Sequence, residues 1–486
     1  MEEGKFIIAT TRYESEGWNS IQMRNGYYLS YRQLRIVSDP DQRVFLLGRS
    51  WQVCPDRPSP QQFVRNGHLT LDSILQAEYS WAGRYALVID GRLYLDYGGQ
   101  MGVFYMDGAC SNSLSVLRRF AERDFINPKL NHDLSPDFVL GMRTMYQGIS
   151  RLLPSQWLYY TTGSAHERKV FAYSENIKYT VDELFNRFEK LFVNSLQNMG
   201  EEFKDSNIFV ALSGGYDSRT TLAALQKSGV PFSAFTLEHP NISQGDIALP
   251  PMVCERLGVS YHFIPREKNA YQSAAKQLYQ QATEHMVVDE DVNFYAYGQY
   301  GRLVKQKPVV ILRNGLWATI REPYFSKGPV DRARFRSIFP GLALDANMDA
   351  SFREYMDYVE ASTLNADIAL QDRIYLDIRV GCWRADIEGG FDVMEGIESV
   401  DPVNSRALLH LLKMLDHEQK VEKKHEVRLT NDMAPQIADI PYEKQYLAKN
   451  SWRARWHAKV RAIRCRVTIV RQWGIAGLLK FQKQSY

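Results

Sequence analysis

The spacing of hydrophobic and polar positions changes about a third of the way along the chain. Before about residue 165, short apolar or alternating runs rich in β-branched and aromatic residues are separated by glycine turns, a pattern typical of β-strands. Asp90-Gly91 stands between two such runs and predicts a tight β-hairpin. The first part of the chain is therefore predicted to be rich in β-structure. The predicted strands are FLLG (45–48), RYALVID (84–90), RLYLDY (92–97), VFYMD (103–107) and QWLYYT (156–161).

After about residue 178, helical and strand patterns alternate. Thr180 and Glu183 form a capping-box pattern at the start of an amphipathic stretch, which predicts a helix. A second helical stretch, DIALPPMVCERLG, is expected to be broken by its prolines. Alternating β and α at this spacing indicates a doubly wound parallel sheet, and the chain beyond it is mostly helical in pattern to about residue 447. The predicted strands are NIFVAL (207–212), FSAFTL (232–237), YHFIP (261–265) and PVVILR (308–313).

Length and composition set the frame for these patterns. A chain of 486 residues is too long for one ordinary core, so we expect an α+β part over 1–165, an α/β part over 178–447 and a separate segment over 448–486. The formal charge of +3 argues against nucleic acid as a partner. No apolar run is long enough to span a bilayer, the N-terminus does not have the pattern of a signal peptide, and the five scattered cysteines are typical of a reduced, cytoplasmic protein.

The clearest chemistry lies in Ser213-Gly214-Gly215-Tyr216-Asp217-Ser218, between a predicted strand and a predicted helix. Two glycines allow a sharp turn whose N–H groups point inward, and the next helix adds its positive end. With the hydroxyl groups of Ser213 and Ser218, this predicts a cradle for a polyanion such as pyrophosphate. A carboxylate repels phosphate, so Asp217 is expected to hold Mg²⁺ or to orient the loop. A glycine turn without a ligand is the alternative, and the full motif in this context favours phosphate binding.

The SGGYDS sequence resembles the pyrophosphate loop of the N-type ATP pyrophosphatases, which cleave ATP between the α and β phosphates. Within that group, four more segments resemble asparagine synthetases, although only the loop is individually specific. The resemblance covers nearly the whole chain and implies an Ntn-hydrolase-like β-sandwich followed by a PP-loop ATP pyrophosphatase domain. The four segments are GVFYM (102–106), LLPSQWLYYTTG (152–163), Glu398-Ser-Val-Asp-Pro402 and IPYEKQY (440–446).

The chain departs from the family pattern at two places. Asparagine synthetases begin with Met-Cys, whereas Glu2 follows Met1 here and the nearest cysteine is Cys54. An N-terminal nucleophile uses its own amino group as base, so we expect the fold without glutaminase activity, as in β-lactam synthetases and lasso-peptide cyclases. The family also has a glycine-rich acidic pair after the strand at 308–313. That carboxylate pair is missing here, although Gly315 can still let a nucleotide approach the backbone.

Four further residues are candidates for the site. Thr236 ends the second parallel strand, which faces adenine in this fold, or belongs to the core. Asp246 could approach the phosphates, but a helix N-cap is the favoured interpretation. The resemblance implies a catalytic role for Glu398, against a surface ion pair. It also implies that Lys444 places a positive charge near the adenylate carbonyl as it becomes tetrahedral, against a solvated lysine beside Glu443.

The C-terminal segment is strongly basic. After Glu443 the chain contains no acidic residue, and apolar and basic positions recur at helical spacing over 451–486. Such a helix could contact an anionic membrane surface or a protein partner. A terminal helix packed on the domain with a solvated basic face is the alternative, and it is the favoured one.

The resemblance predicts an ATP-dependent, amide-forming ligase. ATP and Mg²⁺ would activate a carboxylate as an acyl-adenylate, and an amine or ammonia would then displace AMP. The carboxylate could belong to aspartate, a peptide, a sugar acid or a small metabolite. The missing nucleophile and the missing acidic pair motivate an alternative, a nucleotide-binding or scaffold relative that has lost catalysis.

Overall fold

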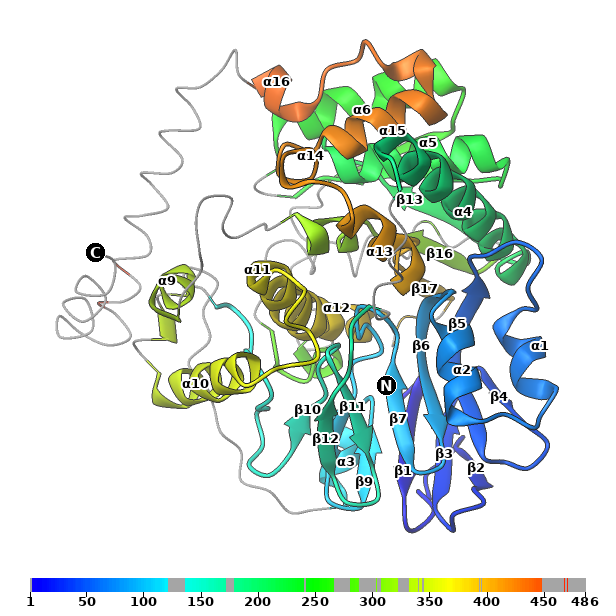
Figure 1. Ribbon diagram of the computed structural model, residues 1–486, viewed down its shortest axis with the longest axis vertical. Coiled ribbons are helices and arrows are strands. Elements are labelled where there is room, and N and C mark those ends of the chain that lie inside the picture. Colours follow the sequence, from blue (N-terminus) through cyan, green and yellow to red (C-terminus); the bar gives the residue numbers. More distant parts are fainter. Residues whose placement is uncertain are drawn as a thin grey trace.

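The computed structural model describes residues 2–120, 136–171, 179–239, 242–265, 280–287, 303, 307–321, 332–339, 341–342, 345–392, 394, 396–447, 467 and 470. Over these residues the protein is mixed α/β, as predicted, with two antiparallel sheets and one parallel sheet. In Figure 1 the blue strands of the antiparallel sheets lie at the bottom, and green helices surround the parallel sheet at the top. None of the helices in this part of the chain is long and apolar enough to cross a membrane. The predicted basic helix over 451–486 falls almost entirely outside the described residues.

The N-terminal part forms two six-stranded sheets, in the orders β10-β8-β9-β1-β3-β2 and β12-β11-β7-β6-β5-β4. All five strands predicted there are present. The Asp90-Gly91 hairpin is confirmed, because Ile89 pairs with Arg92 and both turn residues have positive φ. The strands are β1 (Lys5–Ala9), β2 (Asn19–Gln22), β3 (Tyr28–Arg32), β4 (Ile36–Ser38), β5 (Val44–Gln52), β6 (Trp81–Ile89), β7 (Arg92–Leu95), β8 (Phe104–Met106), β9 (Ala109–Ser111), β10 (Ser150–Arg151), β11 (Gln156–Tyr159) and β12 (Ser164–Glu167).

These two sheets pack face to face. Phe6 and Ile8 of β1 share one buried cluster with Phe45 of β5 and Val88 of β6, so alternate residues of each strand meet in the middle. The other face of β5 and β6 packs with Val64 and with α2 (Leu71–Glu78), through Ile74. Strands buried on both faces read as continuous apolar runs rather than alternating ones. The remaining helices of this part are α1 (Pro60–Arg65) and α3 (Leu114–Arg118).

The parallel sheet has the order β15-β14-β13-β16-β17, and every neighbouring pair is parallel. The carboxyl ends of its strands therefore lie along one edge, with β13 in the centre. Four of the five strands were predicted, and β17 was not. The strands are β13 (Asn207–Ala211), β14 (Ser233–Leu237), β15 (Tyr261–Ile264), β16 (Val309–Leu312) and β17 (Ile397–Val400).

Helix α4 (Val181–Glu202) begins at the predicted capping box, in which Thr180 and Glu183 exchange hydrogen bonds. The expected break in the proline-containing helix was wrong, because α6 (Gln244–Leu257) runs through both prolines. Proline keeps a helical φ but removes its own N–H donor and crowds the carbonyl group four residues earlier, and packing of Leu249 and Val253 in the core offsets this cost. The remaining helices are α5 (Tyr216–Ser228), η1 (Leu316–Ile320), α9 (Arg332–Ile338), α10 (Ala346–Glu360), α11 (Leu370–Ile374), the π-helix η3 (Tyr375–Arg384), α12 (Ala385–Phe391), α13 (Arg406–Lys413), α14 (His417–Val421), α15 (Lys424–Met433), η4 (Pro435–Ile437) and α16 (Glu443–Leu447).

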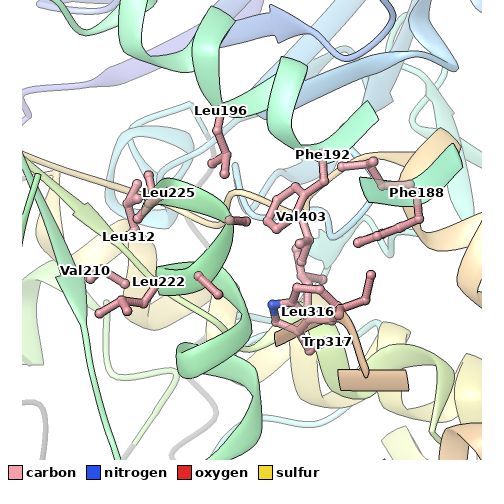
Figure 2. Close-up of a cluster of buried hydrophobic side chains, with 14 of the residues drawn as sticks. Phe188, Phe192, Leu196, Val210, Leu222, Leu225, Leu312, Leu316, Trp317 and Val403 are labelled. Carbon is pink, nitrogen blue, oxygen red and sulfur yellow. The ribbon is translucent and has the colours of Figure 1, made fainter. Parts of the chain in front are cut away.

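One buried cluster fixes the start of α5 against the sheet. Figure 2 shows Leu222 of α5 beside Val210 of β13, with Phe192 of α4 close to Trp317 of η1. The indole N–H of Trp317 also donates to Thr221 of α5 at 3.1 Å. The loop between β13 and α5 is therefore anchored at both ends by a close-packed core.

Candidate functional site

The SGGYDS loop follows β13 at the carboxyl edge of the parallel sheet, as predicted. Its two hydroxyl groups shape the turn. The Ser213 N–H donates to Ser218 Oγ at 3.1 Å, the two Oγ atoms are 3.1 Å apart, and the Gly215 N–H donates to Ser213 Oγ at 3.2 Å. Gly215 is the N-cap of α5 and supplies no side-chain hydrogen bond. The first N–H groups of α5 are therefore left without a side-chain acceptor, which suits an anion.

Gly214 is required by close packing. A Cβ atom at this position would lie 2.9 Å from the carbonyl oxygen of Gly245 and 3.0 Å from a methyl group of Leu249. A Cβ atom on Gly245 would in turn lie 2.8 Å from Cγ of Glu443. The loop therefore packs directly against the backbone of α6, and α6 packs against α16, with no room for a side chain at either glycine.

Asp246 belongs to the loop rather than to a helix cap. Its Oδ1 accepts the N–H of Gly214 at 2.7 Å, while the N-cap of α6 is Ser243, whose hydroxyl accepts the Asp246 N–H at 2.9 Å. The favoured interpretation of Asp246 as an N-cap was wrong, because a serine three residues earlier satisfies the helix. One loop N–H that could bind phosphate is therefore bound by a carboxylate of the protein.

Asp217 faces an arginine. Its two oxygens accept from Nη1 and Nη2 of Arg321 at 2.7 and 3.1 Å, and the same Nη1 donates to Glu426 of α15 at 2.7 Å. Burial works to raise the pKa of Asp217, but the guanidinium outweighs it and lowers this pKa. Burial raises the pKa of Glu426 well above its usual value, and the charge of Asp217 adds to the rise. The cluster therefore holds one carboxylate against one guanidinium, with Glu426 favouring its protonated form.

The described residues do not fit a protein-bound Mg²⁺ at Asp217. Both of its oxygens are used by Arg321. In the described parts of the chain, no group of three or more His, Cys, Asp or Glu side chains is placed to hold a metal ion. Asp217 as a metal ligand is therefore not supported by this geometry, and orientation of the loop is the role that its contacts favour.

Thr236 and Gly315 lie at the same edge of the sheet, and both make contacts within the protein. The buried Thr236 hydroxyl donates to the carbonyl oxygen of Leu212 at 2.8 Å, which ties β14 to the start of the loop. Gly315 makes room for a guanidinium, since a Cβ there would lie 1.5 Å from Nη1 of Arg384. Arg384 in turn pairs with Asp401, whose pKa is raised to about 6 by burial.

Glu398 is not near the loop. It lies in β17 and forms an ion pair with Arg49 of β5, at 2.6 and 2.9 Å. Together they line a cavity of about 280 Å³ that also includes Pro308 and Gly396, the residues before β16 and β17. Glu398 therefore faces the amino ends of these strands, whereas the loop lies at the carboxyl edge. The geometry matches the alternative of an ion pair.

Lys444 lies beside the loop. The N–H of Glu443 donates to the carbonyl oxygen of Gly214 at 2.8 Å, and Lys444 follows with an exposed side chain. Two aromatic rings hold this segment in place, because Tyr442 stacks on Tyr216 of the motif with ring centroids 4.1 Å apart and an angle of 9°. Ser218 and Lys444 are 226 positions apart in the sequence, and the structure brings their two segments together.

Arg219 completes this contact. It is 1% exposed, and its guanidinium donates to the carbonyl oxygens of Ile440 and Pro441 at 2.7 and 2.9 Å. It also lies over the ring of Tyr442 at 4.1 Å. Arg219 is therefore buried and bound to the protein itself. It fixes the segment that leads to Lys444.

Sequence reasoning missed Arg321, Glu426 and the clamp made by Arg219. Arg321 is 104 positions from Asp217, and Glu426 is 105 positions further on. No spacing rule joins residues so far apart. One signal was present in the sequence. Arg321 is a basic residue in the segment after Gly315, where the asparagine-synthetase pattern has an acidic pair.

No protein-family model matches this chain, and no curated protein matches it. Among solved structures it is similar to NMN synthetase from Francisella tularensis, with 18% identity over 41% of this chain and 92% of that chain and a TM-score of 0.22. It is also similar to U34-tRNA thiolase NcsA from Methanococcus maripaludis with its 4Fe-4S cluster, with 10% identity over 55% of this chain and 84% of that chain and a TM-score of 0.22. TM-scores this low carry no argument about fold or activity.

Proposed function

We propose that this protein is an ATP-dependent ligase of the asparagine-synthetase plan, which activates a carboxylate as an acyl-adenylate and converts it to an amide. One observation carries the proposal. The SGGYDS loop joins the central parallel strand to an α5 terminus that has no side-chain cap, and the segment of Lys444 is hydrogen-bonded to it. The same proposal includes three further points. The chain divides into 1–165, 178–447 and 448–486, the first part is Ntn-hydrolase-like, and that part has no glutaminase activity.

In the proposed reaction, ATP binds with its β and γ phosphates at the loop formed by Ser213, Gly214, Gly215 and Ser218. A carboxylate oxygen of the substrate attacks the α-phosphorus, the bond to the bridging oxygen breaks, and pyrophosphate leaves. An amine or ammonia then attacks the acyl carbon, AMP leaves with the electron pair of the C–O bond, and the amine loses a proton. Lys444 stabilises the negative charge that develops on the carbonyl oxygen in this second step.

One arrangement favours a second candidate, a nucleotide-binding relative without catalysis. The Gly214 N–H is bound by Asp246 and the Asp217 carboxylate by Arg321, so two groups of the motif are already satisfied by the protein. ATP binding without turnover of any carboxylate would favour this second function.

The first test is ATP–pyrophosphate exchange, because it reports adenylation without the amine being known. The purified chain is incubated with ATP, MgCl₂, labelled pyrophosphate and a panel of amino acids, peptides and sugar acids. Ser218→Ala should lower exchange by about tenfold, since it removes the acceptor that shapes the loop. Ser228→Ala, in the last turn of α5, is the matched control and should leave the rate of exchange unchanged. ATP binding with no exchange for any carboxylate would contradict the ligase proposal.

The second test separates the two steps at Lys444. Lys444→Gln should retain pyrophosphate exchange and lower amide formation by about 10² to 10³, since it removes one charge that stabilises the developing oxyanion. Lys227→Gln changes an exposed lysine at the other end of α5 and serves as the control. Equal loss of both steps would show that Lys444 acts on the loop and not on the acyl group.

A further inference from the structure

Arg321 fills the space beside Asp217 that a metal ion would need. Its guanidinium binds both oxygens of Asp217 and one oxygen of Glu426, and its side chain is only 10% exposed. The three groups come from α5, from the end of η1 and from α15, so the cation is fixed by three separate elements.

A magnesium ion at Asp217 would have to displace this guanidinium. Mg²⁺ binds carboxylate oxygens at about 2.0–2.1 Å, in octahedral geometry, and usually keeps several waters. Here the oxygens already accept two parallel N–H groups, which is a strong, bidentate arrangement. Displacement would also leave Arg321 without its two acidic partners in a largely buried position.

We propose that Arg321, and not a metal ion held by the protein, is the cation that compensates Asp217, so that the SGGYDS loop binds pyrophosphate without a protein-bound metal. This inference rests on the proposed function of the loop. Arg321 acts through Asp217 and is therefore a positioning residue. By cancelling the charge of Asp217, it removes the repulsion that this carboxylate would exert on a phosphate at the start of α5.

The test uses inorganic pyrophosphate as the probe and measures its affinity for the full chain by calorimetry, once in EDTA and once in MgCl₂. The wild type should bind in EDTA. Asp217→Asn should bind in EDTA as tightly as the wild type or several-fold tighter, because one negative charge is gone and Arg321 remains. A carboxylate that held a metal would give the opposite result, with loss of binding in Asp217→Asn.

Arg321→Met completes the design. It should lower the affinity in EDTA tenfold or more, because Asp217 then repels the ligand. Arg321→Lys keeps the charge but loses the bidentate contact, so its affinity in EDTA should fall between those of the wild type and Arg321→Met. Wild-type affinity in Arg321→Met, or in Arg321→Lys if the methionine variant fails to fold in a thermal melt, would contradict the inference. Arg428→Met, on the same helix as Glu426 but paired at the surface, is the control and should not change affinity.

The outcomes separate this inference from the proposed function. If wild-type binding disappears in EDTA, returns with MgCl₂ and is lost in Asp217→Asn, the protein holds a metal at the loop and the inference is wrong while the phosphate site stands. If the wild type binds pyrophosphate in neither buffer, the loop is no phosphate site and both proposals fall.

Discussion

Replacing Arg219 by methionine should release the segment that leads to Lys444. Methionine keeps much of the length and apolar volume of the side chain but removes the guanidinium. That group donates to two carbonyl oxygens, of Ile440 and Pro441, and stacks on Tyr442. Since Arg219 lies in the first turn of α5, the change tests whether the loop and α16 are held together by this contact.

The expected magnitude follows from the contacts. Hydrogen bonds from a charged donor contribute about 1.5–3 kcal/mol each, and a desolvated cation–π contact contributes up to about 2 kcal/mol. The cost of burying the charge reduces this total. Burial lowers the pKa of Arg219, which shows that the charged form is disfavoured in this position. We therefore expect the segment to detach more easily by about 3 kcal/mol, or about a hundredfold in the opening equilibrium.

Hydrogen exchange followed by mass spectrometry measures this opening directly. The Glu443 amide is bonded to the carbonyl oxygen of Gly214, and the amide of Tyr446 is bonded to Tyr442. Peptides over 438–447 should exchange about a hundredfold faster in Arg219→Met, while peptides over β13 should not change.

Arg256→Met is the matched control. Arg256 donates to the carbonyl oxygen of Gln436 and pairs with Asp439 in the same part of the chain, but its side chain is 48% exposed. Exposed pairs contribute about 0–1 kcal/mol, so exchange in this variant should rise by severalfold at most. Unchanged exchange over 438–447 in Arg219→Met, with an unchanged thermal melt, would refute the clamp.

Three further predictions follow from single contacts. His425 is fully buried, and burial lowers its pKa to about 4. The free energy of unfolding should therefore fall by up to about 3 kcal/mol as the pH drops from 6.5, the usual pKa of histidine, towards 4. His425→Asn cannot take up that proton, so its urea unfolding should depend less on pH than that of the wild type. Asp246→Ala frees the Gly214 N–H and removes a negative charge, so pyrophosphate affinity measured by calorimetry should rise several-fold; a weaker affinity would show that Asp246 organises the loop for its ligand. Glu398→Gln should leave pyrophosphate exchange within about twofold of the wild type, because its ion pair with Arg49 faces the opposite edge of the sheet, and a loss of a hundredfold would restore the catalytic role that the resemblance implied.

Local patterns predicted most of the fold because local interactions decide those elements. The capping box at Thr180 and the hairpin at Asp90-Gly91 each involve residues within three positions of one another. Strand β17 was missed for the opposite reason. It has only four residues, IESV, and it exists because β16, more than 80 positions earlier, offers a parallel edge. A short run that includes Glu398 and Ser399 carries too little apolar signal to predict a strand by itself.

The candidate site shows the same division at the level of single residues. The motif predicted the turn between β13 and α5 correctly because the strand, the glycine turn and the helix are contiguous. It could not tell which side chains face a ligand, because successive residues of a helix point in directions about 100° apart. In the first turn of α5, Tyr216 faces Tyr442, Asp217 faces Arg321, and Arg219 faces Ile440. Three of the side chains at the motif thus bind the protein, and an anion is left to the main-chain N–H groups in the first turn of α5, which have no side-chain cap.

The contacts at the start of α5 connect Asp217 with the Lys444 segment. The start of α5 contacts the Lys444 segment through Arg219 and Tyr442, and Asp217 is joined to α15 through Arg321. If a phosphate drew the Gly214 N–H away from Asp246, the Gly214 peptide would move, and its carbonyl oxygen holds Glu443. Occupation of the loop would therefore shift the residue just before Lys444. A lysine that completes its position only when the loop is filled would act on an adenylate and not on an empty site, which is the order that the proposed two-step reaction requires.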